Sequence, residues 1–267
     1  MEYVHFHNGD TMPVFGLGTW DLRGDTCVNI VAAAIEQGYT LIDTARMYGN
    51  EKEVGRGIRK AGHSRSDLFI TTKIFNPDTT YEKTKRAIED SLKNLGLDYI
   101  DLLLIHEPYA SSLDMYEAMK EARQEGLVRH IGISNFSQRE YKNFVRKCGV
   151  IPAVNQVESH VYYVKENLQR AMASYGTVMQ AWAPFTEGQR PIFSEPILKD
   201  IASDHGKTTR QIALKYLIQR RIPTIAKTSR VERLNENLAL FDFMLTADEM
   251  SAIHTLDEGK SLFGWYE

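Results

Sequence analysis

The stretch Leu41-Ile42-Asp43-Thr44-Ala45-Arg46-Met47-Tyr48-Gly49-Asn50-Glu51 contains the end of a strand, a polar turn and the start of a helix. A short apolar run ends at Asp43, and Tyr48 follows five residues later. Asn50 and Glu53 have the spacing of an N-cap and a glutamate at the third helical position, so we expect a helix to begin there. An apolar core has no use for a carboxylate and a phenol in such a turn. This turn is therefore predicted to form one wall of a catalytic site.

Composition and charge exclude several classes of protein. The net charge of -3 gives no basic surface for nucleic acid or an anionic membrane. Cys27 and Cys148 are too few for a disulfide framework, which fits a reducing cytosol. No apolar run approaches the roughly 20 residues of a membrane helix, and the N-terminus lacks the pattern of a signal peptide. We expect a cytoplasmic protein without nucleic-acid or membrane partners.

Glycines punctuate a repeating order of strand, loop and helix along the chain. Successive glycines that precede strand-like runs are about 23 to 34 residues apart. Units that alternate in this way predict a parallel sheet. Eight candidate strands follow: 14–18, 40–43, 68–73, 99–105, 128–133, 150–154, 177–180 and 222–225.

Eight parallel strands in about 250 residues are the number that closes a barrel. The fold class predicted is α/β, with a single (β/α)8 TIM barrel domain over residues 1–267 and a short N-terminal β-hairpin that turns at Asn8-Gly9. An open doubly wound sheet is the alternative. The pair Gly16-x-Gly18 is not interpreted as a dinucleotide fingerprint, because no third glycine and no immediate helix follow it. Capping boxes are predicted at Thr79 with Glu82, Ser137 with Glu140 and Thr246 with Glu249.

Three successive predicted strands end in residues that are unusual for a core. These residues are Asp43, Lys73 and His106, and Tyr48 lies on the loop after the first of them. Each has a structural explanation of its own, such as turn capping, an extended lysine or a carbonyl hydrogen bond. Adjacent parallel strands lie roughly 5 Å apart, however, so side chains from three neighbouring strand ends can converge on one spot.

The chemistry of these side chains is complementary. A buried Lys73 needs a counter-charge, which Asp43 can supply. A nearby ammonium is expected to lower the pKa of Tyr48, and His106 can orient a substrate oxygen by a hydrogen bond. This set suits the protonation of an alkoxide as it forms on a carbonyl, provided that an electron-pair donor is supplied from elsewhere.

Later strand ends offer a place for that donor. Ser134-Asn135 and Asn155-Gln156 could bind a carboxamide or simply satisfy their loops. Trp182 could stack on a planar ring or pack in the core. After the last strand come Lys227, Thr228, Arg233, Glu236 and Asn237, which could form a phosphate site or a solvated charged face.

With these residues in view, the sequence resembles the aldo-keto reductase family over nearly its whole length. The matching motifs are Gly-Leu-Gly-Thr-Trp at 16–20, Ile-Asp-Thr-Ala-Arg-Met-Tyr-Gly-Asn-Glu at 42–51, Thr-Thr-Lys at 71–73, Leu-Ile-His at 104–106, Gly-Ile-Ser-Asn-Phe at 132–136, Asn-Gln-Val-Glu at 155–158 and Lys227 to Asn237, which leads into Leu-Phe-Asp-Phe at 240–243. The chain is most similar to the bacterial type that includes diketogluconate reductases and prostaglandin F synthase-like enzymes.

The resemblance implies NADPH-dependent reduction of aldehydes or ketones to alcohols. It implies a catalytic tetrad of Asp43, Tyr48, Lys73 and His106, with the tyrosine as general acid and no metal. The implied NADPH-binding residues are Thr19, Ser134, Asn135, Gln156, Trp182, Lys227, Thr228, Arg233, Glu236 and Asn237. The implied substrate-binding residues are Trp20, Met47, Phe75 and Glu107. It also implies a small-molecule carbonyl substrate and a monomer.

The sequence departs from the family pattern at three places. Glu107 replaces a tryptophan after the catalytic histidine, from which we expect a site that disfavours anionic substrates. Ala183 replaces a serine, and Ala226 replaces a proline before Lys227, so cofactor affinity is expected to differ. From the ending Ser261–Glu267 we expect a short loop over the substrate mouth and a roomy site.

Two other functions fit the same residues. Lys73 could act as a Schiff-base nucleophile in a barrel aldolase, although pairing with Asp43 argues against this. The chain could also be an NADPH-binding regulatory or redox-sensing module with little turnover.

Overall fold

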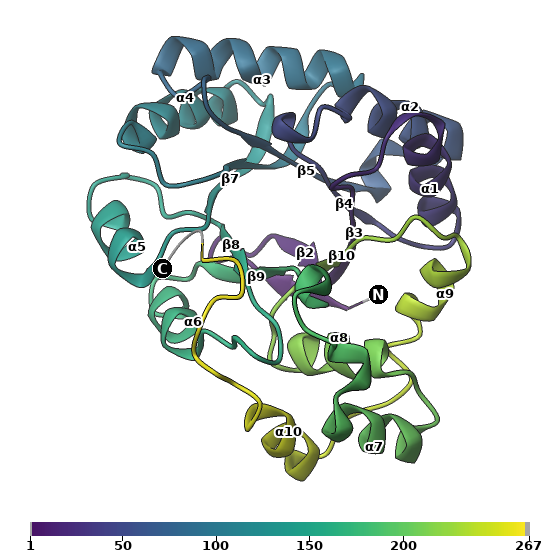
Figure 1. The fold of residues 1–267 in the computed structure, drawn as a ribbon. Coiled ribbons are helices and arrows are strands. Elements are labelled where there is room, and N and C mark those ends of the chain that lie inside the picture. The colour runs from purple at the N-terminus through teal and green to yellow at the C-terminus, as the bar shows by residue number, and fades with distance from the viewer. Residues whose placement is uncertain (1, 265–267) are drawn as a thin grey trace.

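A closed barrel of parallel strands forms the centre of the molecule (Figure 1). The computed structural model describes residues 2–264. The barrel strands, in spatial order, are β10, β3, β4, β5, β6, β7, β8 and β9, so consecutive strands are neighbours and the last pairs with the first. The predicted (β/α)8 barrel is therefore confirmed, and the open doubly wound sheet is wrong.

The barrel strands are short and almost entirely buried. They span Phe15–Gly18 (β3), Leu41–Asp43 (β4), Phe69–Ile74 (β5), Ile100–Ile105 (β6), Val128–Ser134 (β7), Val154–Glu158 (β8), Val178–Trp182 (β9) and Thr224–Ala226 (β10). Most begin or end within two residues of the predicted bounds. The sixth barrel strand is the exception, because the prediction placed it at 150–154.

Ten α-helices lie among the described residues, and they surround the strands (Figure 1). They span Gly24–Glu36 (α1), Glu51–Ala61 (α2), Tyr81–Leu95 (α3), Ser112–Gln124 (α4), Gln138–Val145 (α5), Glu166–Ala173 (α6), Pro196–His205 (α7), Thr209–Gln219 (α8), Glu232–Leu238 (α9) and Ala247–His254 (α10). Gly96 shows why glycines mark the unit boundaries: it ends α3 at a φ of 67°, a left-handed conformation that glycine adopts without strain.

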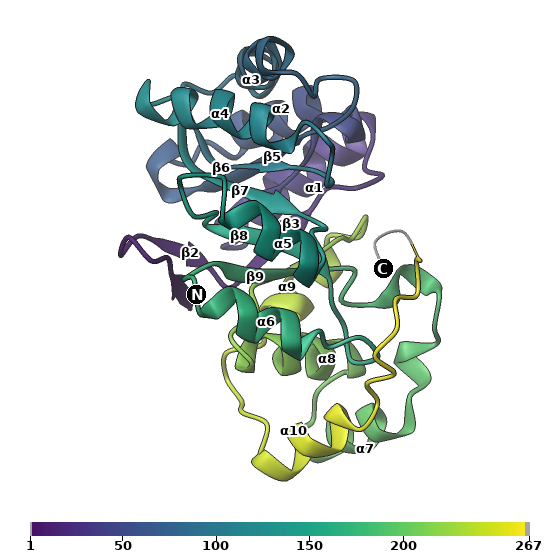
Figure 2. The same cartoon turned by 90° about the vertical axis from the view of Figure 1, so that its left-hand side faces the viewer.

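The N-terminal hairpin closes one end of the barrel. Its strands, Tyr3–His5 (β1) and Thr11–Pro13 (β2), pair antiparallel as predicted. Phe6 and Met12 pack with Leu41, Leu102 and other interior residues of the barrel strands. Figure 2 shows the hairpin at one end of the barrel and the yellow segment that follows α10 at the other. The hairpin therefore covers the amino-terminal ends of the barrel strands and leaves their carboxyl ends open.

Two predicted helix caps are wrong in detail. The residue that caps α3 is Thr80, whose side chain accepts a hydrogen bond from the Lys83 amide, and not Thr79. Asn50 precedes α2 as predicted, but its side chain makes no cap hydrogen bond. It donates instead to the carbonyl oxygens of Thr19 and Leu22, at 2.8 and 3.0 Å. The capping boxes at Ser137 and Thr246 are confirmed.

No helix among residues 2–264 combines the length and the apolar character that a bilayer crossing requires.

Candidate active site

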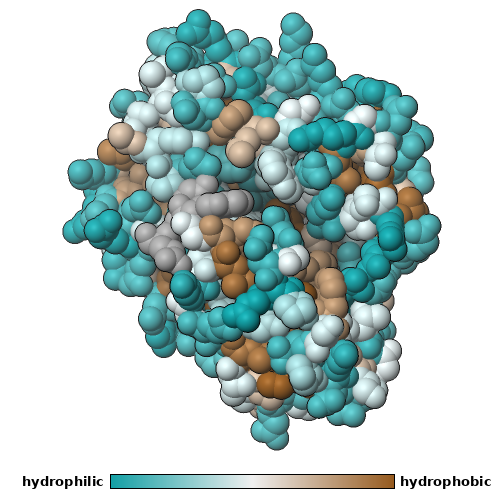
Figure 3. Space-filling model, viewed as in Figure 1, coloured by the Kyte–Doolittle hydropathy of each residue, from teal (hydrophilic) through white to brown (hydrophobic). Residues whose placement is uncertain are grey.

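A cavity of about 720 Å³ opens at the carboxyl ends of the barrel strands. Figure 3 shows this face, which is hollowed near its middle and has apolar groups around the hollow. The volume is that of an ordinary small-molecule site. Most of the predicted site residues line the cavity: Thr19, Trp20, Asp43, Met47, Tyr48, His106, Glu107, Ser134, Asn135, Gln156, Trp182 and Lys227.

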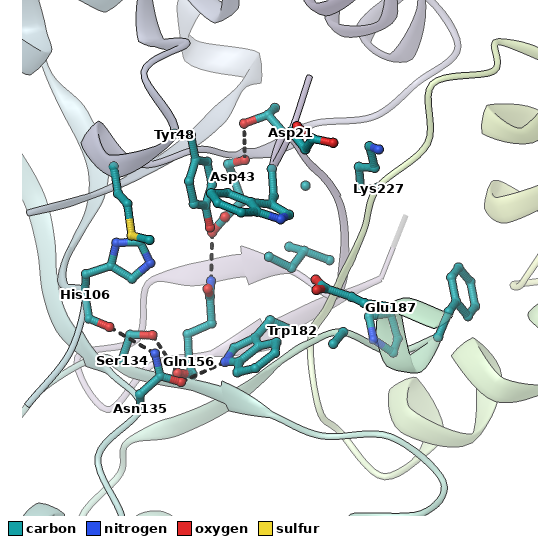
Figure 4. Close-up of a pocket in the computed structure, with 18 of the residues that line it drawn as sticks. Asp21, Asp43, Tyr48, His106, Ser134, Asn135, Gln156, Trp182, Glu187 and Lys227 are labelled. Atoms are coloured by element: carbon teal, nitrogen blue, oxygen red, sulfur yellow. Dashed lines mark hydrogen bonds between the residues drawn. The ribbon is translucent and has the colours of Figure 1, made fainter. Parts of the chain in front are cut away.

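The floor of the cavity is built around a buried ion pair. Lys73 Nζ lies 2.5 Å from Asp43 Oδ1, and both side chains are almost completely buried. Lys73 also donates to the Thr44 carbonyl oxygen at 2.9 Å and to the Tyr48 hydroxyl at 3.3 Å. Gln156 Nε2 donates to the other oxygen of Asp43 at 2.7 Å (Figure 4). As predicted, residues from neighbouring strand ends converge on one spot.

The side-chain charges on this floor favour a lysine that keeps its proton. Although burial alone would lower it, the pKa of Lys73 is raised by the Asp43 carboxylate and the Tyr48 hydroxyl. Burial raises the pKa of Tyr48, while the Lys73 ammonium opposes that shift. Lys73 thus lowers the pKa of this phenol as expected, but burial has the larger effect, so the net shift of the Tyr48 pKa is upward. Tyr48 holds its proton and is placed to donate it.

His106 lies beside the phenol and is uncharged. Its ring is 5.8 Å from the Tyr48 ring, measured between centroids. Burial and the positive charge of Lys73 lower the pKa of His106 to about 3. A neutral imidazole can give or accept a hydrogen bond, but it cannot serve as a cationic acid at neutral pH.

A hydrogen-bonded chain links the histidine to the aromatic platform of the cavity (Figure 4). Asn135 Nδ2 donates to the His106 carbonyl oxygen at 3.0 Å, and Asn135 Oδ1 accepts from Trp182 Nε1 at 2.8 Å. Asn135 holds this position with a φ of 65°. Ser134 Oγ donates to the Gln156 carbonyl oxygen at 2.8 Å. The position and tilt of the Trp182 ring are thus fixed by the protein before any ligand binds.

Cations gather beyond the other end of the cavity. Lys227 lines the cavity itself (Figure 4), whereas Thr228, Arg233, Glu236 and Asn237 lie outside it. Burial lowers the pKa of Arg210, and the charges of Arg233 and Arg230 lower it further. Arg210, Arg230 and Arg233, which we call the arginine cluster, hold like charges close together. Such a cluster fits a binding site for an anion such as phosphate.

Three of the predicted phosphate-site residues have structural contacts. Glu236 Oε1 accepts a hydrogen bond from Thr208 Oγ1 at 2.9 Å, and Thr228 Oγ1 accepts one from the Arg230 amide at 3.1 Å. Asn237 is buried and interacts with the Tyr39 hydroxyl.

The rim near Tyr48 is aromatic and apolar. The Trp20 ring lies 4.9 Å from the Tyr48 ring, and Met47 is 43% exposed. Glu107 follows His106 and also lines the cavity. The structure does not place Phe75 among the lining residues, because this half-buried side chain lies just after β5 and outside the cavity.

Sequence reasoning missed several residues of the site. Gln180 Oε1 accepts a hydrogen bond from Gln156 Nε2 at 2.9 Å, and its position at a predicted strand end was a usable signal. Asp21, Phe185, Glu187 and Phe193 line the cavity, but no sequence pattern indicates where their loops fold.

The segment after α10 reaches the cavity rim. Ser261 Oγ and the Leu262 amide donate to the Glu158 carboxylate at 2.5 and 2.9 Å. The Phe263 ring lies 5.1 Å from the Trp182 ring. The expected short loop over the mouth includes residues 265–267, which lie outside the described part of the chain.

Comparison with known proteins identifies the family. The model of the aldo/keto reductase family matches residues 14–258. The oxidoreductase YtbE of Bacillus subtilis, which is uncharacterised, is 43% identical over 94% of this chain and 91% of its own. An aldo-keto reductase from a Medee basin deep-sea metagenome superposes with a TM-score of 0.97 at 40% identity, over 99% of this chain and 98% of that one. A Bombyx mori aldo-keto reductase in complex with NADP gives a TM-score of 0.92 at 34% identity, over 98% and 94%. The chain therefore belongs to the aldo/keto reductase family of oxidoreductase enzymes.

Proposed function

We propose that this enzyme reduces aldehydes or ketones to alcohols with NADPH, and that Tyr48 is its general acid. One observation carries the proposal: a protonated phenol faces the cavity with its oxygen 3.3 Å from a buried ammonium. Bound NADPH would supply the hydride that the carbonyl carbon accepts.

The residues of the chain would then manage the proton. Tyr48 donates its proton to the carbonyl oxygen as negative charge develops there. The Lys73 ammonium stabilises the phenolate that remains, and Asp43 keeps Lys73 charged and in place. His106, being neutral, donates a hydrogen bond to the substrate oxygen and fixes its direction toward Tyr48. Solvent returns a proton to the phenolate after the alcohol leaves.

The groups present at the site fit a nicotinamide dinucleotide phosphate. The flat Trp182 ring, held by Asn135, suits a planar heterocycle, and Ser134 and Gln156 suit its carboxamide. The arginine cluster suits a phosphate ester, so Lys227 and Arg233 are proposed to bind the 2′-phosphate. Thr19, Thr228, Glu236 and Asn237 complete the proposed binding set. The NADP complex of the Bombyx mori relative supports this assignment.

The proposed substrate mouth consists of Trp20, Met47 and Glu107. They surround Tyr48 and His106 at the rim of the cavity. Phe75 is not included, because it lies outside the cavity.

The Schiff-base alternative fits the structure poorly. A lysine nucleophile must be neutral and must reach the substrate. Lys73 has a raised pKa, and its side chain is 0% exposed beneath Tyr48.

NADPH oxidation with a panel of aldehydes and ketones tests the reductase. Tyr48→Phe removes the proton donor alone, so turnover should fall by about 10²- to 10⁴-fold. NADPH affinity, measured by quenching of tryptophan fluorescence, should change less than about twofold, because Tyr48 is placed toward the substrate oxygen. Tight NADPH binding without turnover by the unaltered enzyme would instead favour the regulatory module.

We also propose that residues 1–267 act as one domain and as a monomer. Light scattering of the purified enzyme during size-exclusion chromatography should give the mass of one chain, 30.5 kDa.

A further inference from the structure

The wall of the cavity carries more negative than positive charge. Among the described lining residues, Asp21, Asp43, Glu107 and Glu187 are carboxylates, and Lys227 is the ammonium. The buried Lys73 neutralises Asp43. His106 adds no positive charge at neutral pH, because its pKa is about 3. The carboxylates that remain outnumber the ammonium.

Apart from Lys73, whose charge is paired with Asp43, the cation among the described lining residues, Lys227, is also far from the reacting end. Figure 4 shows Lys227 and Glu187 on one side of the cavity and His106 on the other. The arginine cluster lies outside the cavity, beyond Lys227. A carboxylate on a substrate bound near Tyr48 would therefore find no lining cation close to it.

Glu107 places a negative charge at the reacting end. It directly follows His106, whose amide donates to the Ile74 carbonyl oxygen at 2.9 Å, so its backbone position is fixed by the barrel. Its side chain interacts with Tyr109. The Tyr109 hydroxyl in turn accepts a hydrogen bond from the Asn76 amide at 3.1 Å. These contacts hold the carboxylate at the rim.

The cavity also offers aromatic faces. Trp20, which is 42% exposed, lies beside Tyr48, whereas Phe185 and Phe193 line the cavity with ring centroids 5.5 Å apart, and the Arg210 guanidinium lies 3.9 Å from the Phe193 ring centroid. Such faces bind flat apolar groups and attract cations.

We propose that the substrates are aromatic or apolar aldehydes and ketones without an anionic group, and that Glu107 sets this preference by repelling carboxylates and attracting cations. The inference rests on the proposed reductase function and specifies its substrate class.

Three benzaldehydes that differ in the charge of the para substituent test this class. They are 4-carboxybenzaldehyde, 4-nitrobenzaldehyde and 4-(trimethylammonio)benzaldehyde, and kcat/KM is measured for each with NADPH at low and high salt. We expect the carboxylate to be at least about tenfold poorer than the nitro compound. Because the nitro group also activates the carbonyl, the repulsion is measured by the part of this ratio that Glu107→Gln removes; a tenfold change equals ~1.4 kcal/mol. Added salt should narrow the difference.

Relative to the nitro compound measured with the same variant, Glu107→Gln should raise kcat/KM for the carboxylate by about tenfold and lower it for the trimethylammonium compound. Glu89→Gln makes the same change of net charge on the outer face of α3 and should alter none of the three. Glu107→Ala repeats the test if the amide variant misfolds.

Equal kcat/KM for all three aldehydes in the unaltered enzyme would overturn the inference, as would preferences that Glu107→Gln leaves unchanged. If none of the three is reduced with NADPH or NADH, the reductase function itself fails.

Discussion

Replacing Lys73 with methionine tests the buried ion pair and separates its structural role from its catalytic one. Lys73→Met keeps a long apolar side chain but leaves the Asp43 carboxylate buried with only Gln156 as a donor. Removing one partner of a buried pair costs about 3–5 kcal/mol. For a chain of this size that corresponds to a fall in melting temperature of roughly 6–10 °C.

The double variant Lys73→Met with Asp43→Asn removes both charges. It should recover more than half of the lost stability, because no uncompensated carboxylate remains. Both Lys73→Met and the double variant should have low turnover, because the Tyr48 phenolate would lack the stabilising ammonium of Lys73. Turnover should be at least about 10²-fold below that of the unaltered enzyme.

The measurements are calorimetric melting temperature and NADPH oxidation at pH 5 and pH 8. In Lys73→Met the unpaired Asp43 has a raised pKa and takes up a proton as pH falls, so its stability deficit should be smaller at pH 5 than at pH 8. A melting temperature for Lys73→Met within 1 °C or so of the unaltered enzyme would refute the reasoning, since a buried carboxylate cannot lose its counter-charge without cost.

Three further predictions follow from the same geometry. The pKa of His106 is about 3, and burial raises the pKa of Tyr48. A plot of kcat/KM for reduction from pH 5 to 10 should therefore show no ionisation near pH 6.5 and should fall only at alkaline pH, where Tyr48 loses its proton. A fall in kcat/KM below pH 6.5 would contradict this prediction. Arg233→Ala should raise KM for NADPH by about tenfold and leave KM for NADH within about twofold, because a contact between a guanidinium and a phosphate contributes about 1.5–3 kcal/mol. Equal effects on the two cofactors would show that Arg233 does not bind the 2′-phosphate. Asn50→Ala should destabilise the enzyme by about 2–4 kcal/mol in urea unfolding, because it removes two buried hydrogen bonds to carbonyl oxygens and the one that the buried Thr44 hydroxyl donates to Asn50 Oδ1; an unchanged midpoint would contradict this.

Much of the fold and the floor of the site could be predicted, because both depend on local patterns. Glycines at left-handed positions mark the repeats, and these repeats determine the parallel barrel. Asp43, Lys73 and His106 each end or follow an apolar strand, so their meeting point follows from the fold. Their contacts are confirmed, and their catalytic roles stay predictions.

Other features could not be predicted because tertiary contacts decide them. The apolar run at 150–154 suggested a strand, but Pro152 lacks an amide hydrogen and the strand begins at Val154. Asn155 and Gln156 consequently lie inside a strand and point to opposite faces of it: Gln156 donates to Asp43 within the barrel, and Asn155 donates to the Phe136 carbonyl oxygen beyond β7. The loop with Phe185 and Glu187 has three non-glycine residues at positive φ between 183 and 187, and the Thr186 hydroxyl donates to the Arg190 carbonyl oxygen at 3.1 Å; no sequence pattern indicates this path.

The pairing of β9 with β10, which closes the barrel, has a consequence for local opening of the strands. The ladder there consists of the single residue pair Thr224 and Ala181, whereas β8 and β9 share five pairs. Trp182 is the last residue of β9, and Lys227 directly follows β10, so the two residues lie on either side of this short ladder. A dinucleotide that contacts both residues would therefore link β9 to β10 and stabilise their pairing. The Ala181 amide donates to the Pro223 carbonyl oxygen across this strand pair at 2.8 Å, so its deuterium uptake should slow markedly once the enzyme is saturated with NADPH.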